Sequence, residues 1–306
     1  MSSTPQIIVI GGPTGSGKTA LAIDIAQLLG TEIINADSRQ VYEELNIGVA
    51  KPNPEELLAI KHHFVSNISI HQHYTAQHFA LEARKKIVEI IEKFGTVVVT
   101  GGTGLYLQAL LYGLDDFPEI SEELKIQLNS QLLEQGLESL VDELLQLDQE
   151  AGENIDLKNP MRVMRALALV KTTDLPLKKI NPSSSEKQLV LPYQVEMFAL
   201  DLPRKQLYER INLRVDNMIS AGLADEVKSL IPHKNLKALN SVGYTELFDF
   251  FDGKCTKEEA IEKIKQHSRN YAKRQVTWFG NKFEMQWLSP EKIKEKIILN
   301  YARNTH

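Results

Sequence analysis

Near its N-terminus the chain reads Gln6-Ile-Ile-Val-Ile-Gly-Gly-Pro-Thr-Gly-Ser-Gly-Lys-Thr19. The apolar first half has the character of a strand buried in a parallel sheet. Residues 20–29 predict a helix that Gly30 ends. Between the two, Gly12 to Thr19 matches the pattern G-x-x-x-x-G-K-[ST] in the strand–turn–helix setting that this pattern needs. We therefore predict a loop, called a P-loop, that binds a diphosphate or a triphosphate.

The chemistry of this loop follows from its residue types. Glycines let backbone N–H groups turn toward a phosphate, and the N-terminus of the following helix adds positive potential. The Lys18 ammonium supplies a positive charge, and the Thr19 hydroxyl can bind Mg²⁺. The residues predicted to bind the phosphates are Gly12, Pro13, Thr14, Gly15, Ser16, Gly17, Lys18 and Thr19. The pattern specifies neither the phosphate compound nor the reaction.

Two more strand–turn–helix units follow the first. Segments 32–36 and 96–100 predict short strands, and the spacing of apolar residues in 75–93 and 105–111 predicts helices. Such alternation predicts an α/β fold with a parallel sheet, whose loops gather at the carboxyl ends of the strands. Asp37 and Thr103 follow the second and third strands, so both are candidate site residues. Two alternatives remain open: Asp37 could cap the next turn, and the glycine-rich turn that holds Thr103 could serve packing alone.

The composition changes after Gly113. Residues 115–156 contain thirteen Asp and Glu against one Lys, whereas residues 158–187 contain seven Lys and Arg against two acids. Periodic Leu and Ile residues predict helices with solvated charged faces in this region. A strand at 192–200 and helices at 204–220, 223–230 and 256–279 then complete the pattern. We expect a core in two parts, residues 1–117 and 192–306, with an all-helical insertion at 118–191 between them.

Global composition excludes several classes of protein. The 306 residues carry 35 Lys and Arg against 40 Asp and Glu, a net charge of −5, so a protein that coats nucleic acid through a general positive field is excluded. The single cysteine, Cys255, excludes an internal disulfide and a cysteine-based zinc cluster. We see neither a leader peptide nor a membrane span, and we expect a cytoplasmic protein with no membrane partner.

Local features still allow a nucleic-acid contact. The segment from Lys263 to Lys282 contains six Lys and Arg residues and no Asp or Glu, and Tyr271, Trp278 and Phe279 lie among them. Such a helix could follow phosphates and stack bases, but it could equally be a solvated helix with Trp278 and Phe279 in the core. The scattered histidines have no zinc-binding spacing and are interpreted as surface and packing residues. They are His62, His63, His71, His73 and His78.

An ordered set of motifs resembles one family, the bacterial tRNA dimethylallyltransferases, also called tRNA isopentenyltransferases. The similarity runs from about residue 6 to residue 287. Its P-loop is generic, whereas the whole set in this order is highly specific. The motifs are Gly12-Pro-Thr-Gly-Ser-Gly-Lys-Thr19, Ala36-Asp-Ser-Arg-Gln-Val-Tyr42, Asn46-Ile-Gly-Val-Ala-Lys-Pro52, Gly101-Gly-Thr-Gly-Leu-Tyr106, Arg162-Val-Met-Arg-Ala-Leu167, Arg210-Ile-Asn-Leu-Arg-Val-Asp216, Val242-Gly-Tyr-Thr-Glu246 and Tyr271-Ala-Lys-Arg-Gln-Val-Thr-Trp-Phe279.

The resemblance implies transfer of a dimethylallyl group from dimethylallyl diphosphate to the exocyclic amine of the adenine 3′ of the anticodon, tRNA position 37. It further implies that Asp37 is the general base, that Thr103 helps to place substrate and that Arg214 helps to neutralise the diphosphate. Mg²⁺, held through Thr19, is the implied cofactor.

The resemblance also implies that the anticodon stem-loop of tRNA is the macromolecular partner, with the inserted segment embracing it. The adenine would leave its stack to reach the site. The protein is expected to be a monomer. The residues expected to contact tRNA are Asp37, Ser38, Arg39, Gln40, Met161, Arg162, Val163, Met164, Arg165, Val242, Gly243, Tyr244, Arg269, Lys273 and Arg274.

Three alternatives keep part of the pattern. A P-loop kinase of a small metabolite also needs Mg²⁺ and a lid, but it leaves the basic helix unexplained. A nucleotide-switched RNA-binding protein leaves Asp37 and Thr103 without a role. An enzyme that prenylates free AMP needs no large insertion.

Overall fold

The computed structural model describes residues 6–114, 117–180 and 189–302. The chain forms two compact units, one combining Met1–Gly113 with Leu189–His306 and the other made by Leu114–Gln188. The second unit therefore begins and ends a few residues before the segment 118–191 that we expected from the sequence. Part of that segment, 181–188, lies outside the described residues.

The core of the first unit is a sheet of six parallel strands in the order β3-β2-β4-β1-β5-β6. Strand β1 is central, and its Ile8 pairs with Val98 on one side and Glu196 on the other. Because helices cover both faces, all five residues of β1 are buried, which explains their continuous apolar character. The strands are β1 (Ile7–Gly11), β2 (Ile33–Asn35), β3 (His62–His63), β4 (Val97–Thr100), β5 (Val195–Leu200) and β6 (Gln286–Leu288). The predicted α/β class with a parallel sheet is confirmed.

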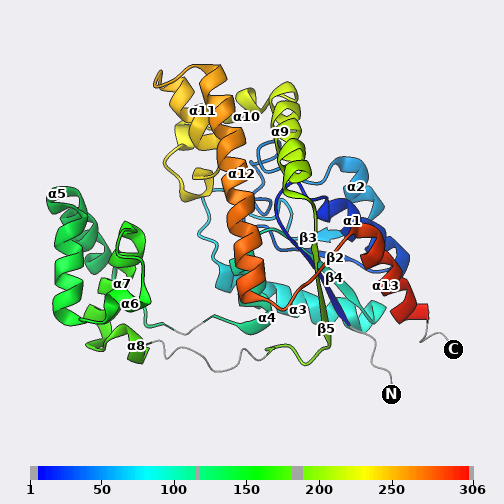
Figure 1. Cartoon of the computed structure of the whole chain (residues 1–306), viewed down its shortest axis with the longest axis horizontal. Coiled ribbons are helices and arrows are strands. Elements are labelled where there is room, and N and C mark those ends of the chain that lie inside the picture. Colours follow the sequence, from blue (N-terminus) through cyan, green and yellow to red (C-terminus); the bar gives the residue numbers. More distant parts are fainter. Residues whose placement is uncertain (1–5, 115–116, 181–188, 303–306) are drawn as a thin grey trace. The chain divides into compact units, whose positions relative to one another are not determined.

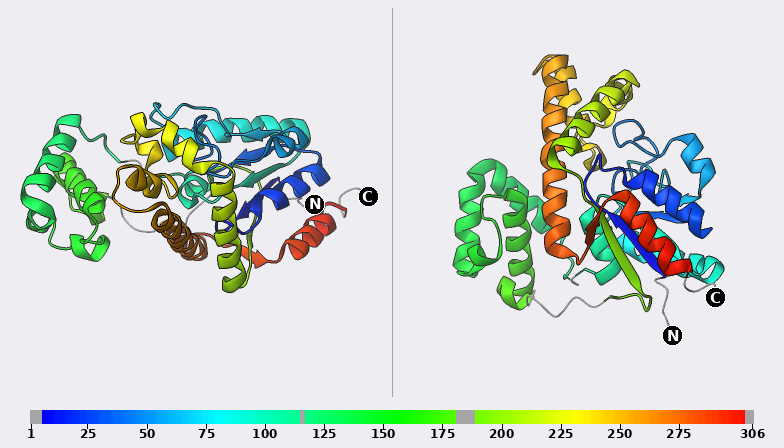
Figure 2. Two further views of the ribbon diagram at one scale, coloured as in Figure 1. Left: turned by 90° about the horizontal axis from the view of Figure 1, so that it is seen from above. Right: turned by 45° about the vertical axis from the view of Figure 1, so that its right-hand side comes forward.

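Helices pack on both faces of the sheet. Helix α1 (Lys18–Leu29) and helix α13 (Pro290–Ala302) share one apolar cluster, in which Ile25 and Ile297 are fully buried. Helices α3 (Ala76–Phe94) and α4 (Gly104–Tyr112) pack together, with the rings of Phe79 and Tyr106 stacked 4.6 Å apart. Figure 2 shows α3 and α13 on opposite sides of the sheet. A short helix, α2 (Pro54–Ala59), precedes β3.

A second group of helices rises beyond the carboxyl ends of the strands (Figure 1). Helix α12 packs against both α9 and α11. It begins with a complete capping box, in which Thr256 and Glu259 each accept a backbone N–H of the other. The helices are α9 (Arg204–Ser220), α10 (Leu223–Ser229), α11 (Tyr244–Phe251) and α12 (Lys257–Lys282), with short 3₁₀ turns η1 (Ile231–His233) and η2 (Lys237–Leu239).

The inserted unit is helical throughout its described residues. Helices α5 and α7 pack through a core that includes Leu140, Leu144 and Leu167. Gly136 has φ 81° and kinks α5, a conformation that favours glycine. The acidic and basic halves meet where Lys171 pairs with Glu143. The helices are α5 (Glu122–Leu147), α6 (Ala151–Asn154), α7 (Pro160–Thr173) and α8 (Leu177–Ile180).

Several element boundaries differ from those we expected. Helix α1 begins two residues earlier, at Lys18, because Gly17 takes the left-handed conformation that caps it. The strand expected at 192–200 begins only at Val195. Elements α2, β3, α11, β6 and α13 were not anticipated. No described helix is long and apolar enough to cross a membrane.

Candidate active site

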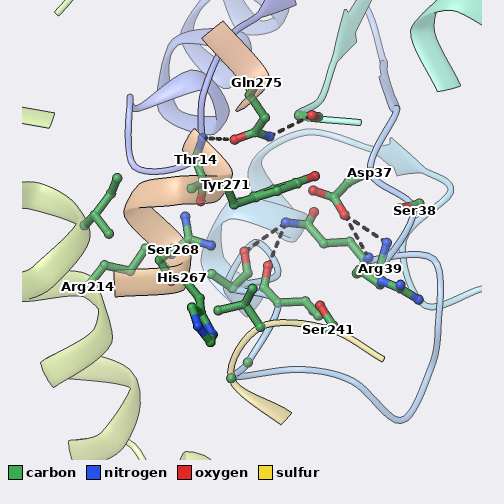
Figure 3. Close-up of a pocket in the computed structure, with 18 of the residues that line it drawn as sticks. Thr14, Asp37, Ser38, Arg39, Arg214, Ser241, His267, Ser268, Tyr271 and Gln275 are labelled. Carbon is green, nitrogen blue, oxygen red and sulfur yellow. Dashed lines mark hydrogen bonds between the residues drawn. The ribbon is translucent and has the colours of Figure 1, made fainter. Parts of the chain in front are cut away.

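A cavity of about 510 Å³ lies at the carboxyl edge of the sheet. Loops that follow β1, β2 and β4 form one wall, and α9, α11 and α12 contribute the other. Figure 3 shows side chains from these separate elements converging on it. The topology therefore brings Lys18, Asp37 and Arg214 to one space, as we expected for a site at the edge of a parallel sheet.

The P-loop has the geometry of a phosphate-binding turn. Gly12, Gly15 and Gly17 have φ values of 127°, 77° and 97°, which residues other than glycine rarely adopt. A Cβ at Gly15 would also lie 2.9 Å from the Ile211 side chain. Helix α1 has no side-chain cap, so its first N–H groups are open to an anion. The Ser16 hydroxyl is buried and has no hydrogen-bond partner among the described residues.

Two positive side chains face the cavity beside this loop. The Lys18 ammonium donates a hydrogen bond to the Pro13 carbonyl at 2.7 Å. Burial, and secondly the charge of Arg214, lower the pKa of Lys18 to about 7, although Asp37 acts in the opposite direction. Burial also lowers the pKa of Arg214, again opposed by Asp37. Neither group forms an ion pair within the described residues, so a bound diphosphate would supply the missing negative charge.

Asp37 combines the two roles that the sequence left open. Its Oδ1 accepts the backbone N–H of Arg39 at 2.9 Å and that of Gln40 at 3.3 Å, so it caps the turn after β2. The carboxylate also lines the cavity and acts electrostatically on both Lys18 and Arg214. The capping bonds fix the carboxyl group and leave it beside the positive charges, where it can accept a proton.

Gln275 on α12 joins two of the strand-end loops. Its Oε1 accepts the Thr14 N–H at 2.8 Å, and its Nε2 donates to the Gly102 carbonyl at 2.7 Å (Figure 3). A Cβ on Gly102 would lie 2.6 Å from that nitrogen, and one on Gly104 would lie 2.2 Å from the Trp278 ring. The glycines of this turn therefore serve close packing, one of the alternatives that we kept open.

Thr103 lies in the same turn but is not among the residues that line the cavity. Its hydroxyl accepts the Ser38 backbone N–H at 3.0 Å and donates to the Ser38 hydroxyl at 3.2 Å. Thr103 therefore holds the loop that carries Asp37, and its expected part in placing substrate stays a prediction.

The Asn46-Ile-Gly-Val-Ala-Lys-Pro52 motif forms a further part of the wall. The Glu226 carboxylate on α10 accepts the N–H groups of residues 46, 47 and 48 and the Tyr244 hydroxyl, the shortest at 2.7 Å. Lys51 donates to the carbonyls of Tyr42 and Glu43, and burial lowers its pKa to about 8. The loop is held from both ends, and nothing in the sequence marked Glu226 as its partner.

Three residues expected to contact tRNA are instead occupied within the protein. The Arg39 guanidinium donates to the carbonyls of residues 237, 238 and 240. The Gln40 amide donates to the carbonyls of Val49 and Ala50. Tyr244 is fully buried, and its hydroxyl donates to Glu226. Arg39 and Gln40 also line the cavity, so their contact with tRNA stays a prediction, whereas the Tyr244 side chain has no exposed surface with which to touch RNA.

The remaining loop residues expected to contact RNA stay at the cavity. Ser38, Val242 and Gly243 line it. Beside them, the buried carboxylate of Glu246 accepts the Gly243 N–H at 2.7 Å and pairs with His267 Nδ1 at 2.6 Å.

The basic helix divides into two faces. Phe279 is fully buried and Trp278 packs against Gly104, so these two rings belong to the protein interior. Lys273 and Arg274 are exposed, whereas Arg269 donates to Asn212 on α9 at 2.6 Å. Tyr271 is the aromatic residue of this helix that lines the cavity.

The inserted unit presents some of its expected RNA-binding residues to solvent. Met161, Arg162 and Arg165 are exposed at the start of α7, and Met164 is half-buried. Val163 is fully buried in the core of the unit, so its side chain is not free to touch RNA.

The histidines act in packing. His63 pairs with Glu32 at 2.6 Å, and the rings of His71 and His233 meet edge to face. The described residues contain no group of three His, Cys, Asp or Glu placed to hold a metal ion.

The fold and the cavity together define a class: α/β proteins with a P-loop, in which a carboxylate lines a cavity beside positive side chains. Comparison with known proteins narrows this class. The family model of the IPP transferases matches residues 40–282. The tRNA dimethylallyltransferase of Cytophaga hutchinsonii is 42% identical over 289 residues, covering 94% of each chain. This chain belongs to the IPP transferase family, the tRNA dimethylallyltransferases.

Solved structures agree with this assignment. The tRNA delta(2)-isopentenylpyrophosphate transferase of Staphylococcus epidermidis is 36% identical, with a TM-score of 0.66 and 98% of each chain covered. A eukaryotic dimethylallyltransferase acting on tRNA is 26% identical, with a TM-score of 0.74, covering 98% of this chain and 77% of that one.

Proposed function

We propose that this protein transfers the dimethylallyl group of dimethylallyl diphosphate to the exocyclic amine of the adenine 3′ of the anticodon in tRNA. The observation that carries the proposal is the convergence of Lys18, Arg214 and Asp37 on one cavity beside the P-loop. Two positive groups suit a diphosphate leaving group, and a carboxylate opposite them suits a base for the amine.

The transfer requires one bond to break and one to form. The C1–O bond of dimethylallyl diphosphate breaks, and its electron pair leaves with the diphosphate. The lone pair of the adenine amine forms the new N–C1 bond, and the nitrogen then loses one proton to Asp37. The P-loop N–H groups, Lys18 and Arg214 act where negative charge accumulates, because the leaving oxygen carries more charge in the transition state than in the substrate.

The residues of the P-loop fit a divalent cation such as Mg²⁺. Thr19 lies in the first turn of α1, and Ser16, whose hydroxyl has no partner among the described residues, precedes it by three residues in the chain. Mg²⁺ takes oxygen ligands and commonly uses one or two protein groups together with phosphate oxygens. Bound there, it would neutralise part of the charge on the diphosphate.

For tRNA recognition we propose two surfaces. One is the exposed start of α7 in the inserted unit, with Met161, Arg162 and Arg165, and the other is the exposed side of α12 with Lys273 and Arg274. Positive side chains on each suit contacts with RNA phosphates. We propose that the protein acts as a monomer in the cytoplasm, where its substrate tRNA is found.

Mass spectrometry of tRNA nucleosides tests the proposal directly. Purified protein with dimethylallyl diphosphate, Mg²⁺ and unmodified tRNA should add one dimethylallyl group to adenine. The same reaction with free AMP in place of tRNA should give no product. A failure with every tRNA that carries adenine at this position would refute the proposal, and phosphate transfer from ATP would indicate a kinase instead.

A further inference from the structure

Tyr271 is an aromatic residue of the cavity to which neither the P-loop nor the base chemistry gives a role. We propose that its ring stabilises the positive charge that develops on the dimethylallyl group during transfer. This inference rests on the proposed function, because it concerns the same cavity and the same reaction.

The Tyr271 ring lies where the dimethylallyl group would be transferred. Tyr271 projects from α12 into the cavity, and its side chain extends toward Asp37 (Figure 3). Gln275, one turn later on the same helix, touches the P-loop at Thr14. The ring therefore lies between the loop that holds the leaving group and the carboxylate that accepts the proton. The transferred carbon must cross this interval.

The ring is partly open and held in place. Tyr271 is 36% exposed although it lines the cavity, so part of its surface is open to a ligand. Its hydroxyl lies near the Thr103 hydroxyl, which donates to the Ser38 hydroxyl at 3.2 Å. The Arg274 guanidinium lies 5.7 Å from the ring centroid, so one cation already lies near the ring.

The hydroxyl is a poor candidate for the proton transfer. Burial, and secondly the nearby Asp37 carboxylate, raise the pKa of Tyr271 to about 12. The hydroxyl therefore keeps its proton at neutral pH and accepts none from the amine. The ring is the part of the side chain that remains to act on the substrate.

A neutral aromatic ring suits a developing allylic cation better than a carboxylate does. As the C1–O bond breaks ahead of N–C1 formation, positive charge spreads over the allylic carbons while the diphosphate takes the electron pair. A carboxylate beside these carbons could capture them as an ester, whereas an aromatic face attracts the charge without forming a bond. The adenine nitrogen then supplies the electron pair of the new bond, and Asp37 takes its proton.

A graded series of side chains at position 271 tests the proposal. Single-turnover rates would be measured for Tyr271→Phe, for Tyr271→Leu and for phenylalanines carrying one, two and three ring fluorines, which weaken the aromatic face stepwise at nearly constant shape. Affinities for tRNA and for the unreactive dimethylallyl thiolodiphosphate would be measured on the same proteins. These affinities confirm that each variant retains a folded cavity.

We expect Tyr271→Phe to keep the rate within about threefold, and Tyr271→Leu to lower it about 5- to 30-fold with both affinities unchanged. The rate should fall progressively with each added fluorine. An equal loss in the Phe and Leu variants would assign the effect to the hydroxyl and refute the proposal. A flat fluorine series would refute it too, as would weaker tRNA binding at an unchanged rate, which indicates stacking on the base. Wild-type protein without transferase activity would refute the proposed function together with this inference, whereas an active wild type matched by Tyr271→Leu would refute the inference alone.

Discussion

Diphosphate binding should be coupled to protonation of Lys18. The pKa of this lysine is about 7 in the ligand-free protein, because burial and Arg214 disfavour its charge. A diphosphate near the ammonium favours the charged form and raises the pKa again. At pH 8 only about a tenth of the free protein carries the ammonium, so binding should take up about 0.9 protons per site.

The affinity for a diphosphate ligand should depend on pH, because binding is coupled to protonation of Lys18. Between pH 8 and pH 9 the apparent Kd for a diphosphate ligand should rise about tenfold, whereas near pH 6 the protonation of Lys18 should contribute no further change. Calorimetric titration with dimethylallyl thiolodiphosphate, in buffers of different ionisation enthalpy, measures the proton uptake directly. Both the free protein and the protein saturated with tRNA should be titrated.

Two variants separate this effect from other titrations. Lys18→Arg keeps a permanent charge, so its proton uptake should fall to near zero. Lys51→Arg removes the other lysine with a lowered pKa, which is engaged with backbone carbonyls, and should leave the uptake unchanged. No proton uptake by the wild type at pH 8 would refute the view that a largely neutral Lys18 awaits the ligand.

Three further predictions concern other parts of the site. Asp37→Asn keeps an oxygen to cap the turn but loses the base, so single-turnover transfer should fall about 10²- to 10⁴-fold with tRNA affinity unchanged; comparable losses in both would assign Asp37 to recognition. Tyr244→Phe deletes one of the hydrogen bonds to Glu226, and hydrogen exchange at residues 46–48 should quicken about fivefold; unchanged protection would show that the backbone bonds suffice. Neutralising Arg269, Lys273 and Arg274 together should weaken tRNA binding. The slope of log K against log salt concentration should fall by about 2 rather than 3, because Arg269 is already bound to Asn212. An unchanged slope would exclude α12 as an RNA-binding surface.

Local pattern was enough to predict the parts of the fold that depend on neighbouring residues. The P-loop, the central strands and the long helices were predictable because glycine spacing and apolar periodicity are written into short segments. Strand β3 was not, since it consists of His62 and His63, which have no apolar pattern and pair with Ile33 and Ile34 of β2. Strand β6 has only three residues and lies at the other edge of the sheet.

The site was predictable to the same extent. Lys18 lies at the end of the loop that follows β1, and Asp37 lies just after β2, so the topology of the sheet brings them together. Gln275 and Glu226 act through partners up to 261 and 180 positions away, and no local signal identifies such pairs. The resemblance implied that Arg39 contacts tRNA, but no local signal showed that its guanidinium donates to carbonyls of the distant 237–240 turn.

The hydrogen bonds of Gln275 to Thr14 and Gly102 also determine when, during synthesis of the chain, the cavity can assemble. Thr14 and Gly102 are translated early, but the amide that joins them is added only when α12 is synthesised, 173 residues after Gly102. A chain that stops before α12 therefore has a complete P-loop sequence and no assembled cavity. Products that terminate before α12 should be unable to sequester tRNA at a half-built site, because the cavity is assembled only after Gln275 has been added.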